Sequence, residues 1–176
     1  GLTRAGAGAG EAVFVSGWPG RASAGLASHL AGETGAADAL AAALHRPEPR
    51  VELGTRLRDA GASACVDVSD GLAADLGHVL DASAVGAEIR CEALPCPAAL
   101  AAAGSAEQVR AWILHGGDDY ELCFTADPGL DTERLAAEGG ITVTRIGTVT
   151  EVPGLRLIEA DGASHVLDPG GYRHFE

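Results

Sequence analysis

The 176-residue sequence contains neither lysine nor methionine. Without lysine there can be no Walker-type phosphate-binding loop, because that loop needs a lysine to reach the phosphates. Because a complete, unprocessed translation product starts with methionine, we expect the chain to be a cleaved protein or a piece of a longer one. The chain also lacks any run of 18 apolar residues, and this argues against a membrane-spanning helix within it.

Positive charge is scarce. The chain has 12 basic residues, all of them arginine, against 25 acidic ones, for a formal net charge of -13. A surface this acidic repels nucleic-acid backbones and anionic membranes, so we expect neither as a partner. An acidic protein can still bind phosphates when a divalent cation lies between its carboxylates and the phosphate.

Several familiar catalytic and metal motifs are missing as well. The four cysteines form no CxxC pair and no cluster with zinc spacing. Three of them, Cys65, Cys91 and Cys123, lie in strand-like apolar runs, which is typical of reduced thiols in a cytoplasmic protein. There is no GxSxG nucleophile motif, and no GxGxxG opens a helix after a strand.

Apolar patterning predicts strands and helices that mix throughout the chain. Without strict alternation of strand and helix, the pattern indicates an α+β domain, layered like α/β folds, with a mixed β-sheet and packed helices. Residues 1–10 are glycine-rich and predict a linker. Strands are expected at 11–17, 62–68, 85–91, 119–125, 141–151 and 155–160, and helices at 20–31, 35–45, 50–60, 71–82, 97–103, 106–114 and 131–138.

The first cluster of candidate functional residues is VDVSDGL, at residues 66–72. It spans a strand-to-helix turn, where backbone N–H groups favour phosphate and carboxylates favour magnesium. We expect the carboxylates of Asp67 and Asp70 to share a hollow in which cations hold a polyphosphate. In the alternative interpretation, Ser69 or Asp70 only caps the helix.

The second cluster is HGGDDYELCF, at residues 115–124. Its two glycines allow a tight turn with positive φ, and Asp118, Asp119 and Glu121 follow directly. Like charges this close raise the pKa of a carboxyl group or recruit a cation. The alternative is a glycine turn whose acids are simply solvated.

Two further features carry weaker signals. Arg4 could place its guanidinium on a phosphate, or it could be a solvated arginine. The tail GYRHF, at residues 171–175, could stack on a planar ring, or it could fix the C-terminus to the core.

These motifs, in this order and spacing, resemble the C-terminal domain of the thiamine-monophosphate kinase family. That family belongs to a larger group with aminoimidazole-ribonucleotide synthetase and selenophosphate synthetase. The resemblance covers essentially the whole chain. It rests on TRAGA (3–7), HRPEPRVELG (45–54), VDVSDGLAADLGHV (66–79), LPCP (94–97), HGGDDYELCFT (115–125), RIGTV (145–149) and GYRHF (171–175).

The resemblance implies transfer of the γ-phosphoryl group of ATP to thiamine monophosphate, giving thiamine diphosphate and ADP, with Mg²⁺ as cofactor. It implies no protein nucleophile, because a phosphate oxygen of the substrate attacks. The roles that it implies are ATP contacts from Arg4 and Ser69, magnesium ligands Asp67 and Asp70, and substrate contacts from Asp118 and Phe175.

It also implies that residues 11–176 are the C-terminal domain of the kinase and that 1–10 are what is left of an interdomain linker. The N-terminal domain, which carries further magnesium ligands and the usual homodimer interface, is then absent, so we expect the chain alone to be inactive. Two alternatives stay open: a related ATP-dependent synthetase, and a non-catalytic domain that binds a metal or a nucleotide.

Overall fold

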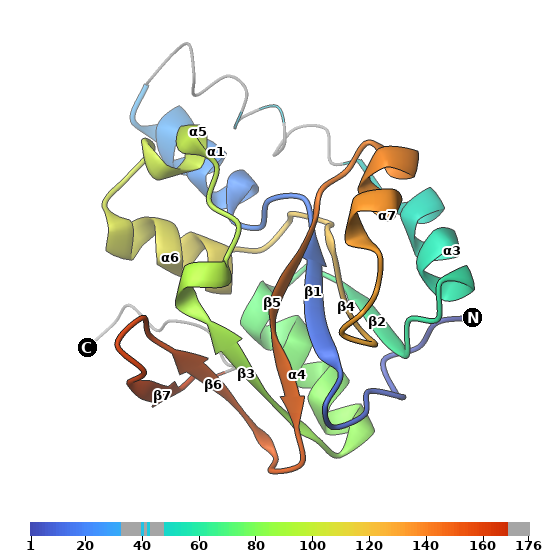
Figure 1. Cartoon of the computed structure of the whole chain (residues 1–176). Coiled ribbons are helices and arrows are strands. Elements are labelled where there is room, and N and C mark those ends of the chain that lie inside the picture. Colours follow the sequence, from blue (N-terminus) through green and yellow to red (C-terminus); the bar gives the residue numbers. More distant parts are fainter. Residues whose placement is uncertain (33–39, 41, 43–47, 169–176) are drawn as a thin grey trace.

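The computed structural model describes residues 1–32, 40, 42 and 48–168. At its centre is a seven-stranded sheet with the order β2-β4-β1-β5-β3-β6-β7 (Figure 1). Neighbouring strands are antiparallel except β3 and β6, which are parallel, so the predicted mixed sheet is confirmed. The strands are β1 (Ala12–Ser16), β2 (Ala64–Asp67), β3 (Gly86–Arg90), β4 (Leu122–Ala126), β5 (Val143–Thr150), β6 (Gly154–Ile158) and β7 (Ser164–Val166).

Helices cover both faces of this sheet, which gives three layers (Figure 1). One face packs against α1 (Arg21–Leu30), α4 (Leu72–Ser83), α5 (Ala98–Ala101) and α6 (Ala106–His115). The other face packs against α3 (Val51–Asp59) and α7 (Thr132–Gly139). A short 3-10 turn, η1 (Cys91–Ala93), follows β3.

The central strand β1 shows why the sheet has two buried faces. Val13 and Val15 belong to the core beneath α4 and α6, whereas Ala12 and Phe14 belong to the core beneath α3 and α7. Successive side chains of a strand point to opposite faces, so an unbroken apolar run such as AVFVS fits a strand covered on both sides. On the α3 side, Phe14 stacks on Phe124 of β4, with ring centroids 5.2 Å apart.

Most of the predicted elements are confirmed, with boundaries shifted by a few residues. The predicted strand 119–125 begins only at Leu122, because the residues before it form a loop. The three exposed residues of β7 were not predicted, since they carry no apolar alternation. Cys91 lies in η1 and not in a strand. The predicted helix 35–45 lies outside the described residues, apart from positions 40 and 42.

The state of the cysteines agrees with the prediction of reduced thiols. All four are free; Cys123 is buried, Cys65 and Cys91 are half-buried, and Cys96 is exposed.

Among the described residues, no helix has both the length and the apolar character needed to cross a bilayer.

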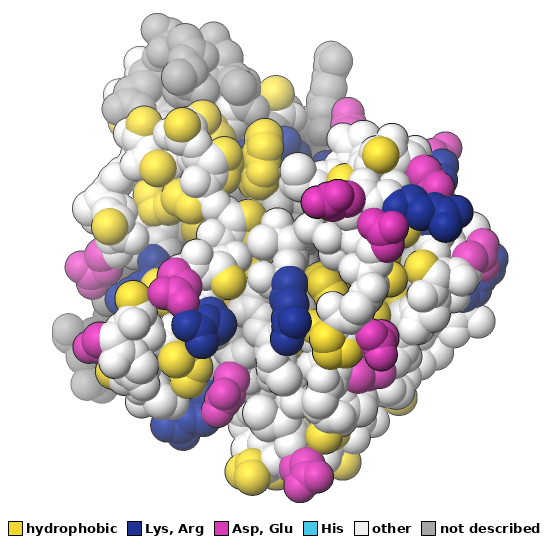
Figure 2. Space-filling view, viewed as in Figure 1, with side chains coloured by type: hydrophobic (Ala, Val, Ile, Leu, Met, Phe, Trp, Pro, Cys, Tyr) yellow, Lys and Arg dark blue, Asp and Glu magenta, His cyan; other side chains and the backbone are white. Residues whose placement is uncertain are grey.

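On the coloured part of the face seen in Figure 2, arginines alternate with acidic side chains and do not gather into one basic patch. Hydrophobic side chains gather at the upper left of this face, over α1 and α5. The coloured part of this face therefore carries no continuous positive patch.

Candidate functional site

Two loops that carry candidate residues lie against each other. The aspartate loop (67–71) joins β2 to α4, and the acidic loop (116–121) joins α6 to β4. The N–H of Asp118 donates to the carbonyl of Ser69 at 3.0 Å. Two more backbone hydrogen bonds, of 2.9 and 2.7 Å, connect Val68 to the acidic loop. The fold therefore brings the two sequence clusters together.

Two glycines permit this close approach. Gly71 has φ +121, and a Cβ there would lie 2.9 Å from the carbonyl oxygen of His115. A Cβ on Gly117 would lie 2.6 Å from the carbonyl oxygen of Ser69. A larger residue at either position would push the loops apart.

The aspartate loop is held by a carboxylate of the helix that follows it. Oδ2 of Asp75, in the first turn of α4, accepts the N–H groups of Ser69 at 2.8 Å and of Asp70 at 2.9 Å. These two N–H groups are therefore already paired with a carboxylate, and an ATP contact by Ser69 stays a prediction. The helix-cap interpretation is not supported either: the N-cap of α4 is Gly71, which makes no side-chain cap hydrogen bond.

In the acidic loop, Asp119 holds the start of α1. Its Oδ2 accepts the N–H of Gly20 at 2.6 Å, and its Oδ1 accepts that of Ala22 at 3.0 Å. Burial raises the pKa of Asp119 to about 6, against the lowering effect of these two hydrogen bonds. The carboxylate therefore has a structural role at the start of α1 and does not face solvent.

Glu121 is also buried and paired with other residues of the fold. It is 1% exposed and forms an ion pair with Arg50, with Nη2 2.8 Å from Oε1. Ser16 donates its hydroxyl to Oε2 at 2.5 Å. The hydrogen bond with Glu121 raises the pKa of Arg50 above its ordinary value. The interpretation of a turn with solvated acids is therefore wrong for Asp119 and Glu121, whereas Asp118 is exposed.

The acidic loop has a strained backbone. Asp118 has φ +62 and Tyr120 has φ +53, both in the left-handed region. Each costs roughly 1–2 kcal/mol for a residue with a Cβ. Contacts elsewhere must therefore hold the loop in this shape.

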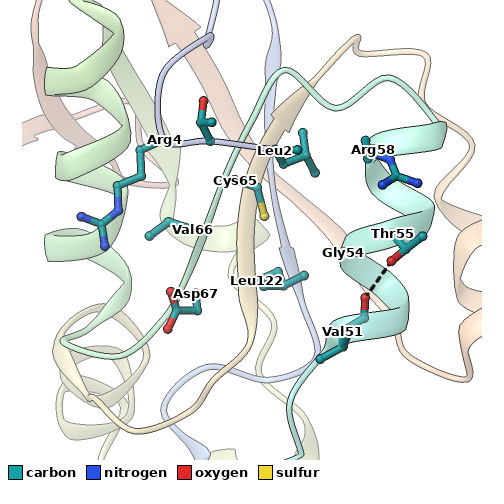
Figure 3. Close-up of a pocket in the computed structure, with 12 residues that line it drawn as sticks. Leu2, Arg4, Val51, Gly54, Thr55, Arg58, Cys65, Val66, Asp67 and Leu122 are labelled. Atoms are coloured by element: carbon teal, nitrogen blue, oxygen red, sulfur yellow. Dashed lines mark hydrogen bonds between the residues drawn. The ribbon is translucent and has the colours of Figure 1, made fainter.

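A pocket of about 480 Å³ brings together Arg4 and Asp67, two of the predicted site residues. Figure 3 shows them on one side of the pocket and the residues of α3 on the other, with Cys65 and Leu122 between them. Both Arg4 and Asp67 are exposed, so their charged groups are available to a ligand. Burial raises the pKa of Cys65 to about 11, so its thiol stays neutral near pH 7.

Asp70 belongs to a different group. Its carboxylate lies with Asp75 and His78, and one potential ligand atom from each falls within 4.8 Å of the others. Carboxylate oxygens suit a hard cation such as Mg²⁺, so the donor chemistry fits. Of these two aspartates, Asp67 is among the described residues that line the pocket and Asp70 is not. That the carboxylates of Asp67 and Asp70 share one hollow therefore stays a prediction. Phe175 lies outside the described residues.

Three residues that shape the site were missed by the sequence analysis: Ser16, Arg50 and Asp75. Nothing in the local pattern sets Ser16 or Asp75 apart from other polar residues. Arg50, in contrast, is the last residue of HRPEPR, a segment that contributed to the family resemblance.

Comparison with known proteins gives a consistent result. Residues 8–159 match the family model for AIR synthase related protein, C-terminal domain. The chain is 44% identical over 182 aligned residues to thiamine-monophosphate kinase of Escherichia coli K12, covering 99% of this chain and 55% of that protein. The chain thus spans about half the length of the curated relatives it matches.

Solved structures show the same likeness. Thiamine-monophosphate kinase from Stenotrophomonas maltophilia K279a superposes with a TM-score of 0.84 at 39% identity, over 93% of this chain and 54% of that one. A structure of AaThiL complexed with AMPPCP and TMP superposes with a TM-score of 0.83 at 32% identity, over 99% of this chain and 54% of that one.

Proposed function

Since this chain belongs to the family of AIR synthase related protein C-terminal domains, we propose that it is part of a thiamine-monophosphate kinase. That enzyme transfers the γ-phosphoryl group of ATP to thiamine monophosphate. In this proposal residues 11–176 are its C-terminal domain and residues 1–10 belong to the interdomain linker. The enzyme works in the cytoplasm, as the reduced cysteines suggest.

The observation that carries the proposal is the contact between the aspartate loop and the acidic loop. It places Ser69 beside Asp118, and the end of β2 next to them carries Asp67 into the pocket with Arg4. The likeness to a kinase in complex with AMPPCP, an ATP analogue, and TMP supports the assignment of both substrates.

In the mechanism we propose, this chain positions the two substrates and neutralises their charge. Arg4 and Ser69 bind phosphate oxygens of ATP, and Asp118 binds thiamine monophosphate. Asp67 and Asp70 hold Mg²⁺, which when bound neutralises charge on the transferred phosphoryl group. A phosphate oxygen of thiamine monophosphate attacks the γ-phosphorus, and the bond from that phosphorus to the bridging oxygen of ADP breaks. No protein nucleophile is required.

We further propose that the chain alone is inactive and that the complete enzyme is a homodimer. The relatives are nearly twice as long, since the match covers 55% of the E. coli protein. Arg4, Asp67 and Asp70, which we assign to ATP and Mg²⁺, are all exposed, so a second domain can complete the site.

A binding measurement and an activity measurement test the proposal. Calorimetric titration of the chain with magnesium-AMPPCP should detect binding that Asp67→Asn weakens by about tenfold or more. Glu88→Gln is the matched control, because Glu88 is an exposed acid on β3, remote from β2 in the sheet. In an ATP-dependent assay, thiamine diphosphate should form only when the rest of the enzyme is joined to this chain. Failure of the joined protein to form it would refute the kinase assignment, and formation by the chain alone would refute the proposed inactivity.

A further inference from the structure

One motif has no role in the proposed function: HRPEPR at residues 45–50, of which the structure describes 48–50. Its last residue, Arg50, lies directly before α3 and reaches Glu121 at the end of the acidic loop. Nη2 donates to Oε1 at 2.8 Å, and Nε donates to Oε2 at 3.0 Å. The two side chains are 11% and 2% exposed. A forked pair of hydrogen bonds fixes the relative orientation of two groups as well as their charge balance.

The carboxylate of Glu121 is held from another direction by β1. The hydroxyl of Ser16 donates to Oε2 at 2.5 Å and accepts the N–H of Leu122 at 2.9 Å. Gly17, with φ +53, leaves no spare volume, because a Cβ there would lie 2.2 Å from Oε1. Backbone, hydroxyl and guanidinium together therefore leave this carboxylate a single position.

Arg50 also stands between two parts of the proposed site. The helix α3 begins at the next residue, and its first turn lines the pocket that contains Arg4 and Asp67. Glu121, on the other side of the ion pair, ends the loop that carries Asp118. The ion pair therefore ties one wall of the pocket to the acidic loop.

We propose that Arg50 is a positioning residue for phosphoryl transfer, an inference that rests on the proposed function. Its fork on Glu121 holds the strained acidic loop against the aspartate loop, so that Asp118 and Ser69 face the reacting phosphates together. Arg50 acts through Glu121 and not on the substrates, because its guanidinium is engaged by the carboxylates of Glu121 and Glu48.

The first test uses this chain and needs no substrate. Amide hydrogen exchange is measured by NMR at Asp118 and Tyr120, whose N–H groups donate to the aspartate loop. Arg50→Lys keeps the charge and removes the fork, and it should speed exchange at both amides by about tenfold. Arg50→Ala should speed exchange further, but it leaves Glu121 buried without its cation. Should that variant unfold, the result for Arg50→Lys decides the test.

The matched control is Arg56→Ala, which lies in α3 six residues after Arg50. Arg56 pairs with Glu138 on the surface at 3.1 Å, and its side chain is 36% exposed. Its removal should leave exchange in the acidic loop unchanged. Exchange that stays at the wild-type rate in Arg50→Lys would overturn the proposal.

The second test uses the complete enzyme. Arg50→Lys should lower kcat by about tenfold or more, because small misplacements of reacting groups slow the chemical step, while the KM for ATP stays within about twofold. Arg50→Lys should retain more activity than Arg50→Ala. Faster exchange with a wild-type kcat would show a purely structural role and overturn the proposal. If the wild-type enzyme itself forms no thiamine diphosphate, the proposed function fails and the role in transfer with it, whereas the exchange rates still decide whether Arg50 orders the loop.

Discussion

The aspartate loop and the acidic loop meet at one place, yet they are held by different means. The aspartate loop is fixed by Asp75, which lies six residues from Ser69 and five from Asp70. The acidic loop is fixed by Arg50, Ser16 and Gly20, which are 71 to 105 residues away from their partners in it. One loop is therefore supported by its own helix, and the other requires β1, α1 and α3 to be in place.

The difference shows how this chain uses acidic residues. Buried carboxylates fix both loops: Asp75 of α4 holds the aspartate loop, and Asp119 and Glu121 tie the acidic loop to distant elements. In each loop an exposed carboxylate, Asp70 or Asp118, is left available for ligands. Because the acidic loop also carries two residues with left-handed backbones, its shape depends on distant contacts. Changes to its supports should therefore cost more than changes to the support of the aspartate loop.

The largest effect is expected from a direct comparison of the two supports. Glu121→Ala removes the buried partner of Arg50 and leaves its guanidinium only the exposed Glu48, at 3.2 Å. It should lower the free energy of unfolding by about 3–5 kcal/mol. Asp75→Ala leaves two N–H groups without a partner in a partly solvated loop and should cost about 1–3 kcal/mol. Urea denaturation of both variants measures the two values. Equal costs, or the reverse order, would contradict the distinction between distant and local support.

A smaller effect should come from the space around the carboxylate of Glu121. Gly17→Ala combines a positive φ of +53 with a Cβ 2.2 Å from Oε1. It should destabilise the fold by roughly 2–3 kcal/mol. Gly162→Ala is the control, because Gly162 has φ +86 and nothing within 4 Å of its Cβ position. It should cost about 1 kcal/mol, from the backbone alone. Thermal unfolding of both variants separates the steric contact from the backbone strain. Equal losses of stability would mean that the carboxylate of Glu121 can move away from the added Cβ.

Local patterns in the sequence predicted most of the fold. The apolar run of β1 and the periodicity of α4 reflect burial on both sides of a sheet and on one face of a helix, and both are visible without partners. The start of β4 was placed too early because Tyr120 favours strands, whereas contacts with the aspartate loop impose a left-handed backbone there. The exposed strand β7 left no pattern to detect.

The site was only partly predictable for a related reason. Motifs placed Asp67, Ser69 and Asp118 at loop ends, and the fold brings their loops together. The roles of Asp119 and Glu121 depend on partners far away in sequence, and no periodicity reports such partners. Three acids in one short segment therefore suggested repulsion, whereas the structure pairs two of them with N–H groups, a hydroxyl and a guanidinium.

The smallest effect is expected from the titration of Asp119. Burial raises its pKa from 3.8 to about 6 in the folded chain, so the folded state binds its proton more tightly than the unfolded state does. This contribution to stability is fully present below 3.8 and is lost as the pH rises through about 6. Asp119→Asn cannot titrate at this position, so it serves as the reference. Between about pH 4 and pH 7, the unfolding free energy of wild type should fall relative to that of the variant by at most about 2 kcal/mol. Urea denaturation across that range measures the difference. If wild type instead became more stable relative to the variant as the pH rises, the hydrogen bonds from Gly20 and Ala22 would affect the pKa of Asp119 more than burial does. The carboxylate would then favour its charged form at the start of α1.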